Sequence, residues 1–278
     1  MYVWCTYASD AHLAQALVFH NMMKYTKTKY EIWCIVSGQY QNILAEYYDK
    51  VITVDKLLLN GEDLTKLLVF SPSLFPAKKV IYCDPSVHFN ENCDYLFSIE
   101  TPAVIYGGFG YKPNNPFSKY NQGEIISRAL LLKNIKSGVI AQSCIFSIEP
   151  SKYRSAILRK LINENVVSKY IEKYNSGPPR LHKKHRDSTE LCLSLILLCD
   201  GRPVRQLLSE DINYIGGYKD HCPKIVYLPK NIKFPTVSSR SERNLVLRYN
   251  ACDEVRNWWT HAANIIDDSP GLEKYFYV

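Results

Sequence analysis

Short apolar runs alternate with segments of helical periodicity through the first hundred residues. Four apolar runs predict strands, at residues 2–8, 30–38, 50–54 and 79–83. Helices are expected between them, one from Asp10 as its N-cap to Met23 and others near 40–48 and 62–69. Strands joined by helices at this spacing predict an α/β fold with a mixed, mostly parallel sheet, helices over its faces, and ligands at the carboxyl ends of the strands.

The pattern changes in the middle of the chain. Residues 107–124 are rich in Gly, Pro and Asn and predict a long excursion over one face, of a length typical of lids. Residues 141–151 then return to strand, and Ser151 opens a helix. The apolar spacing predicts that this helix buries Tyr153, Ala156, Ile157 and Leu161.

The second half adds one basic loop and two helices. Residues 175–187 predict a strongly basic loop, 189–199 a buried helix, and 253–268 an amphipathic helix. No composition shift marks a linker. We therefore expect one domain over residues 1–252, with the helix and tail of residues 253–278 packed on it.

Composition narrows the class of protein. The 278 residues are 46% hydrophobic, no apolar run approaches about 20 residues, and the first residues lack the basic flank of a signal peptide. We expect a cytoplasmic globular protein without a membrane segment. The net charge of +7 suits phosphate-bearing ligands or simply a basic surface, and nucleic-acid binding has no motif to support it. Nine cysteines without a C-x-x-C pair predict reduced thiols and no structural zinc.

One strand end carries candidate metal chemistry. The stretch "KVIYCDPSV" ends a buried strand at Cys83, and Asp84 follows it directly. A carboxylate at the carboxyl end of a strand stands where a metal-bound ligand would lie. Asp84 is therefore a candidate metal ligand, and the question is what accompanies it.

The order of motifs over residues 2–236 resembles the family 8 glycosyltransferases, the group that includes glycogenin and galactinol synthase. This resemblance implies the GT-A fold in a single domain and transfer of a hexose from a UDP-sugar with retention of anomeric configuration. In particular, "TYASDAHLAQALVF" at 6–19 is similar to the family's uracil-binding turn. Carried over, the residues that line the base pocket are Thr6, Ala8, Ser9, Asp10 and His12; the alternative is a plain strand-to-helix turn.

Two motifs bear on the donor diphosphate. "LTKLLVF" at 64–70 is similar to the family's T-K-L motif, so Lys66 is expected near the diphosphate unless it is simply solvated. "KVIYCDPSV" resembles the strand that ends in D-x-D, with Asp84 as the metal ligand and Ser86 in place of the second carboxylate. A serine hydroxyl is a weak, neutral ligand, which argues against Mn²⁺ or Mg²⁺ at this position.

In the family, three later motifs contact the sugar and supply the third metal ligand. "AQSCIFSIEPS" places Gln142 and Cys144 where the family has a sugar-facing asparagine and glycine. "TELCLS" places Thr189 at the position of the catalytic aspartate with Glu190 beside it, although a small shift would bring Asp187 or Glu190 to that position. In "YLPKNIKFP", the metal-binding histidine is replaced and the phosphate-binding lysine is kept. These two positions are Tyr227 and Lys233.

Two functions from different classes remain open. The first is an active, divergent glycosyltransferase, in which the lysines and the basic segment 180–186 hold a nucleotide-sugar without a metal, or His88 or His221 substitutes as a metal ligand. The second is a catalytically inactive GT-A protein that binds a partner. Its surface candidates are the basic segment, which can also be a solvated loop, and Trp258 and Trp259 of the C-terminal helix. The resemblance extends to compact relatives in large DNA viruses, which would place the protein in a virion or the host cytoplasm.

Overall fold

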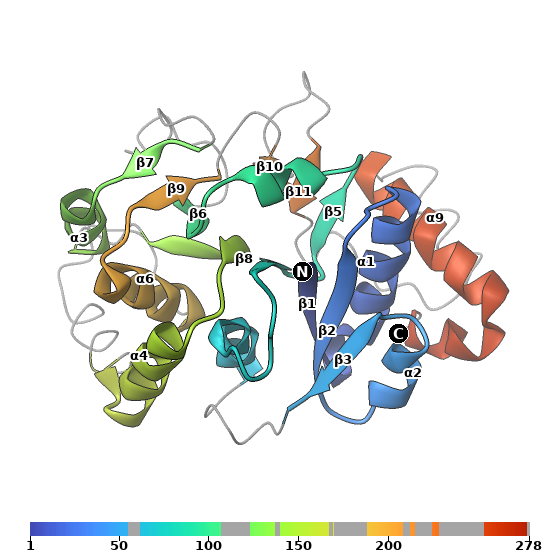
Figure 1. Cartoon of the computed structure of the whole chain (residues 1–278). Coiled ribbons are helices and arrows are strands. Elements are labelled where there is room, and N and C mark those ends of the chain that lie inside the picture. The colour runs from blue at the N-terminus through green and yellow to red at the C-terminus, as the bar shows by residue number, and fades with distance from the viewer. Residues whose placement is uncertain are drawn as a thin grey trace, which may run out of the picture.

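The computed structural model describes residues 1–54, 62–106, 123–136, 140–166, 169, 188–207, 212–214, 224–227 and 253–276. An eight-stranded sheet runs in the order β3-β2-β1-β4-β8-β6-β9-β7 (Figure 1). The strands are β1 (Tyr2–Ser9), β2 (Glu31–Ser37), β3 (Lys50–Thr53), β4 (Lys79–Cys83), β6 (Ala103–Tyr106), β7 (Ile125–Ile126), β8 (Ala141–Ile148) and β9 (Val204–Gln206). The first four strands in this order are parallel, and β8 runs antiparallel to both of its neighbours. The predicted mixed, mostly parallel sheet is confirmed.

Helices cover both faces of this sheet (Figure 1). On one face lie α1 (Leu13–Tyr25), α2 (Gln41–Ala45) and α9 (Asp253–Asp268), which share one apolar cluster. On the other lie η3 (Glu62–Phe70), α3 (Arg128–Lys136), α4 (Lys152–Asn163) and α6 (Ser188–Asp200). Short 3-10 turns are η1 (Asp10–His12), η4 (Asp94–Ser98) and η5 (Pro270–Tyr275), and a small sheet joins β5 (Val87–Phe89), β10 (Ile212–Tyr214) and β11 (Ile225–Tyr227).

The alternation of side chains along β1 shows why a strand forms there. Trp4 and Ala8 enter the apolar cluster under α1, while Val3, Cys5 and Tyr7 enter the cluster under η3. A strand that is covered on both faces must be apolar at nearly every position. The continuous apolar run of residues 2–8 satisfies that requirement, as do the runs of β2 and β4.

The start of α4 corrects one prediction about burial. Ser151 caps the helix, because its hydroxyl accepts a hydrogen bond from the backbone N–H of Arg154 at 3.1 Å. From that start the inward positions are 154, 158 and 161, so Tyr153 is 60% exposed and Ala156 is exposed. The expectation that Tyr153 and Ala156 are buried was wrong, because the inward position of the first turn is taken by Arg154, a charged residue that an apolar pattern does not mark.

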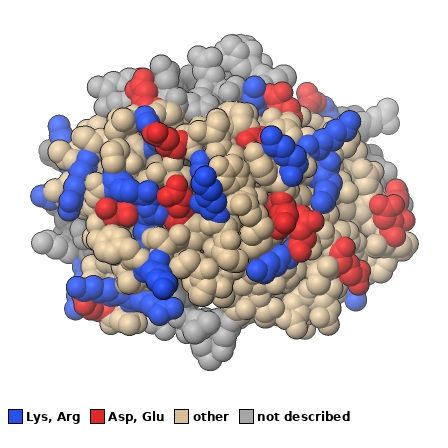
Figure 2. Space-filling view, in the orientation of Figure 1, with Lys and Arg blue, Asp and Glu red and all other residues tan. Residues whose placement is uncertain are grey.

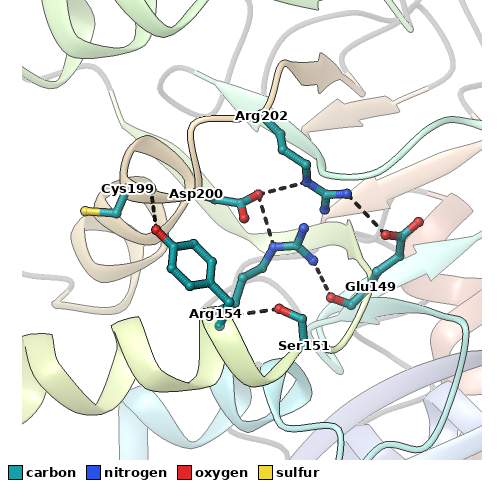
Figure 3. Close-up of polar contacts among 7 residues, drawn as sticks. Glu149, Ser151, Arg154, Cys199, Asp200 and Arg202 are labelled. Atoms are coloured by element: carbon teal, nitrogen blue, oxygen red, sulfur yellow. Dashed lines mark hydrogen bonds and ion pairs between the residues drawn. The ribbon is translucent and has the colours of Figure 1, made fainter.

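A buried ion pair connects α4 to the end of α6 (Figure 3). Arg154 Nε lies 3.1 Å from a carboxylate oxygen of Asp200, and their side chains are only 4% and 6% exposed. The same oxygen accepts from Arg202 Nε at 3.0 Å, and Arg202 also reaches Glu149 at 3.2 Å. Arg154 donates to the backbone carbonyl of Glu149 as well. These contacts fix the carboxyl end of β8 relative to two helices, at the opposite edge from the site below.

The C-terminal helix α9 packs against α1, and its tryptophans point inward. Trp258 and Trp259 are 2% and 1% exposed and meet edge to face, with Phe276 beside Trp258. His261 makes a 2.8 Å hydrogen bond to Asn21 of α1. The interpretation of the two tryptophans as surface candidates for a partner was wrong, because the amphipathic pattern of this helix records its contact with the protein core.

Asp10 does not cap the first helix. Ser9 precedes the 3-10 turn η1 and His12 precedes α1, neither with a side-chain cap hydrogen bond. The Asp10 carboxylate instead accepts a hydrogen bond from the backbone N–H of Gln39 at 3.2 Å. Asp10 therefore connects the ends of β1 and β2.

Two further features concern the surface. On the face shown in Figure 2, basic and acidic side chains are interspersed over the described part of the surface, without the continuous basic stripe typical of nucleic-acid binding. Within the described residues, no helix combines the length and the apolar character that crossing a bilayer requires.

Candidate functional site

The carboxyl ends of β1, β2 and β4 lie along one edge of the sheet. Ser9 and Ser37 are paired at the ends of β1 and β2, and β4 is parallel to β1 on its other side. Asp84 follows β4 directly, and its backbone N–H donates to the carbonyl of Cys144 in β8 at 2.7 Å. The residues that were predicted at strand ends are therefore gathered at the edge where α/β proteins bind ligands.

The ammonium of Lys66 lies against the Asp84 carboxylate. Nζ is 3.2 Å from Oδ1 and 3.4 Å from Oδ2, and it also donates to Ser143 Oγ at 3.0 Å. The Tyr82 hydroxyl donates to the same Oδ1 at 2.8 Å. Burial, and then the Asp84 charge, raise the pKa of the Tyr82 phenol, so it remains a donor. The Lys66 and Asp84 side chains are 12% and 19% exposed, which makes them a largely desolvated pair that an incoming anion can still approach.

A bulge in β8 brings Ser143 to Lys66. Consecutive β6 residues Val104 and Ile105 pair with Phe146 and Gln142, so the intervening β8 residues 143–145 have no partner in β6. Bulges redirect side chains and are frequent beside functional sites. Here the irregularity lies directly beside Asp84 and changes the face on which Ser143 and Cys144 project.

Helix α6 brings Glu190 to the same place. Ser194 ties the helix to β8, because its hydroxyl accepts from the backbone N–H of Ala141 at 2.8 Å and donates to the carbonyl of Glu190 at 2.9 Å. Burial raises the pKa of the Cys144 thiol, and the negative charges of Asp84 and Glu190 raise it further. Both carboxylates therefore act on one thiol, with the Lys66 charge opposing them.

The other predicted catalytic residues are more deeply placed. Thr189 is fully buried and Gln142 is 5% exposed. Gln142 Oε1 accepts no hydrogen bond from the described residues, although a buried carbonyl oxygen usually has a partner. Of the predicted catalytic set, Glu190 is the partly exposed residue and the one with a carboxylate.

The predicted base pocket lies farther along the edge. The Ser9 hydroxyl and His12 Nδ1 are 2.7 Å apart, and the His12 ring lies 6.3 Å from the Tyr7 ring. Tyr7 in turn shares a short hydrogen bond with Ser37. Thr6 and Ala8 are buried within β1 beneath these residues. Of the predicted set, Ser9, Asp10 and His12 thus lie at the end of the strand, with Ser9 buried and Asp10 exposed.

Gly38 shapes this part of the edge. Its φ is +131°, and a Cβ built on it would lie 2.0 Å from Asp10 Oδ1. A side chain at that position would require the Asp10 carboxylate to move, and L residues rarely adopt that backbone conformation. Glycine therefore allows Asp10 to cross over the end of β2 and accept from Gln39.

The residues present do not fit a divalent cation, which a GT-A resemblance implies. Ser86 offers no charge, and the backbone of Tyr227 is paired with Val87, beside Ser86, where an imidazole would be needed. No cluster of three or more His, Cys, Asp or Glu side chains occurs in the described ranges. At an effective dielectric constant of about 20, charges of +1 and +2 about 4 Å apart repel by about 8 kcal/mol. A metal could therefore bind Asp84 only if Lys66 moved away.

Two histidines, His88 and His221, were predicted as alternative metal ligands, and the structure describes only the first of them. His88 is 2% exposed, and its ring lies 6.2 Å from that of His261 in α9, so it takes part in the packing of that helix. His88 is therefore placed as a core histidine. His221, Lys233, Asp187 and the basic segment 180–186 lie outside the described residues, as does most of the excursion 107–124.

Sequence reasoning missed two residues of this site. Tyr82 lies two positions before Asp84, and the period of a strand would have placed both side chains on one face. Ser143 had no such signal, because only the bulge in β8 turns it toward Lys66. The approach of Lys66 to Asp84 was also absent from the pattern, since it depends on how η3 packs on β4.

No family model matches the chain. A relative, the uncharacterized protein R707 of Acanthamoeba polyphaga mimivirus, is 27% identical over 187 residues, which span 61% of this chain and 62% of that protein. Among solved structures, the galactosyltransferase LgtC in complex with donor and acceptor sugar analogs has a TM-score of 0.58 at 11% identity, covering 99% of this chain and all of that one. The chain has the GT-A fold.

Two further GT-A structures are similar at the same level. An active-site mutant of LgtC gives a TM-score of 0.55 at 10% identity, covering 93% of this chain and 100% of that one. The glycosyltransferase GlyE of Streptococcus pneumoniae TIGR4 gives 0.51 at 11% identity, covering 99% of this chain but only 64% of that protein. At these identities the likeness concerns the fold, so activity has to be argued from the site.

Proposed function

We propose that this protein is a divergent, family 8-like glycosyltransferase that transfers a hexose from a UDP-sugar to an acceptor with retention. The observation that carries this proposal is the contact between Lys66 and Asp84 beside the β8 bulge at the carboxyl edge of a GT-A sheet, with Glu190 on the helix that Ser194 ties to β8. Such an edge binds the donor in α/β folds, and the site offers a cation for phosphate and a carboxylate for the sugar.

The proposed transfer sets the roles of these groups. The bond between the anomeric carbon and a β-phosphate oxygen breaks, and its electron pair stays on the diphosphate. The acceptor oxygen bonds to the anomeric carbon on the face from which the diphosphate leaves, and its proton passes to the departing oxygen. A positive charge beside the diphosphate stabilises the negative charge that develops there.

Each site residue then has an assigned task. The uracil lies against Ser9 and His12, and the diphosphate lies against Lys66, with Lys233 as a second contact in the family-like motif. Gln142 supplies a buried carbonyl oxygen that lacks a donor among the described residues, which a sugar hydroxyl can satisfy. The Glu190 carboxylate stabilises positive charge at the anomeric carbon.

Binding and turnover test this proposal separately. Isothermal titration calorimetry with UDP, UDP-glucose and UDP-galactose should give saturable binding, and ADP should bind at least about tenfold more weakly. Mass spectrometry of reactions with each donor should then show free UDP and a hexose added to an acceptor or to the protein itself. A protein that binds none of these nucleotides at millimolar concentration would contradict the proposal.

A second candidate, a GT-A protein retained for binding without catalysis, is favoured by two observations. The position of the family's catalytic aspartate is Thr189, which is fully buried, and the sugar-facing glycine is Cys144, whose side chain takes up space there. Nucleotide binding without any UDP release from UDP-sugars would favour this second function. A partner could then bind through the C-terminal helix region or the basic segment 180–186.

A further inference from the structure

We infer that Lys66 takes the place of the divalent cation, so that this protein neutralises the donor diphosphate with a side chain held on Asp84. This inference rests on the proposed function, since it names how the proposed donor is held. The observation behind it is the placement of the Lys66 ammonium against both oxygens of Asp84, the residue that would ligate the metal.

The surroundings hold the ammonium at that place. Asp84 supplies the opposite charge, Ser143 supplies a second acceptor at 3.0 Å, and Nζ lies 5.9 Å from the centre of the Tyr82 ring. The ammonium carries a full positive charge at this place, so it can stabilise the negative charge of a diphosphate that lies beside it. The pair leaves part of its surface accessible at the sheet edge.

The charge balance at the site agrees with the replacement of a divalent cation by the Lys66 ammonium. Two carboxylates would oppose a divalent ion, and here one carboxylate opposes one ammonium. Replacement of the second carboxylate by Ser86 removes a negative charge that Lys66 alone could not balance. The neutral Ser86 in place of a carboxylate and the ammonium of Lys66 on Asp84 are thus two parts of the same arrangement.

The alternative is that Lys66 and Asp84 form an ordinary structural ion pair without a role in binding the donor. A structural pair would stabilise the fold but leave nucleotide affinity unchanged when the charge is removed. Lys24 provides a matched control, because it forms an exposed ion pair with Asp49 at 3.6 Å, in the last turn of α1. Lys24→Met removes the same charge away from the site.

The experiment is calorimetric titration of UDP into four proteins, each with EDTA and with MnCl₂. The wild type should bind equally well in both buffers, and Lys66→Met should lose about 10- to 100-fold in affinity. Lys66→Arg should retain part of the affinity, since it keeps the charge, and Lys24→Met should match the wild type. Circular dichroism melting of each variant establishes that it is folded.

A rescue variant tests directly whether the Lys66 ammonium excludes a metal ion from Asp84. Ser86→Asp and Tyr227→His alone should give little manganese binding, because the ammonium still lies on Asp84. Adding Lys66→Gln should create UDP binding that requires Mn²⁺, together with loss of the free Mn²⁺ signal in electron paramagnetic resonance. This second readout does not depend on the nucleotide.

The outcomes distinguish a failure of the inference about Lys66 from a failure of the proposed function. Wild-type binding of UDP that requires Mn²⁺, or a folded Lys66→Met protein that binds as tightly as the wild type, would overturn the inference while leaving the proposed function intact. Absence of UDP binding by the wild type in both buffers would overturn the proposed function itself, and the inference with it.

Discussion

Arg154 and Asp200 form an ion pair at 3.1 Å in a place where both side chains are almost completely buried. Removing Arg154 takes away one of the two cationic partners of the Asp200 carboxylate, because Arg202 Nε still lies 3.0 Å from the same oxygen. A buried charge left entirely unpaired costs about 3–5 kcal/mol, so we expect Arg154→Met to lower the free energy of unfolding by part of that, about 2 kcal/mol, in urea denaturation.

A double variant checks the cause of that loss. Replacing both members, as Arg154→Met with Asp200→Leu, should recover most of the stability, because no uncompensated charge remains. Equal losses in the single and double variants would mean that the packing of the side chains, rather than their charge, is what matters here.

Gly38 is expected to be intolerant of any side chain. A Cβ would overlap Asp10 Oδ1, and the φ of +131° is unfavourable for L residues. Gly38→Ala should therefore destabilise the protein by at least about 1 kcal/mol in thermal or urea unfolding. Combining it with Asp10→Gly should restore the part caused by the overlap but not the part caused by the backbone. A neutral Gly38→Ala variant would show that the end of β2 can relax.

His20 should make the protein less stable in acid. Burial, followed by the Lys24 charge, lowers its pKa from 6.5 to about 4. The unfolded chain therefore binds the His20 proton between these values while the folded chain does not, so stability is lost as pH falls from about 6.5 to about 4. The total from this residue is up to about 3 kcal/mol.

The matched variant for this effect is His20→Phe. A phenyl ring can keep the contacts with the rings of Tyr47 and Tyr48, at 5.9 and 5.1 Å, without a titrating group. The pH profile of unfolding free energy should be flatter over this window in the variant. Parallel profiles would assign the acid sensitivity to other groups.

Thiol reactivity should separate one cysteine from six others. Cys199 is exposed, whereas the remaining cysteines in the described ranges are buried, and burial raises the pKa of the Cys5, Cys34, Cys83, Cys144 and Cys192 thiols. Since the thiolate is the reactive form, native protein treated with iodoacetamide should be alkylated first at Cys199 among these seven. Peptide mapping by mass spectrometry reads this out, and rapid labelling of Cys144 would show that the site opens to solvent.

Parts of this fold follow from local pattern. The strand at Lys79–Cys83 and the helix at Asp253–Asp268 have the predicted bounds, because a fully apolar run and a strong helical period each allow one interpretation. Tyr153 shows the limit of the method, because the inward position of the first turn belongs to Arg154, whose burial depends on its ion pair with Asp200 in another helix.

The candidate site depended on contacts between distant segments. Asp84 and Lys66 were each predicted from motifs, but their contact across 18 residues was not, and Ser143 reaches them across 77 residues from Lys66. The pairing of Tyr227 with Val87 likewise joins two strands of the small sheet that lie far apart in the chain. Such pairings are set by the packing of whole elements, on which a local pattern carries no information.

The hydrogen bond between Asn21 and His261 joins residues that are 240 positions apart. The apolar side of α1 is thus covered by a segment that the ribosome adds long after α1 itself has emerged. Loop closure over such a separation is entropically slow, so this face should remain open during synthesis and close only at a late stage of folding. Until then, the nascent chain would expose the surface that Trp258 and Trp259 later cover, which makes it a natural client for a chaperone that binds apolar surfaces.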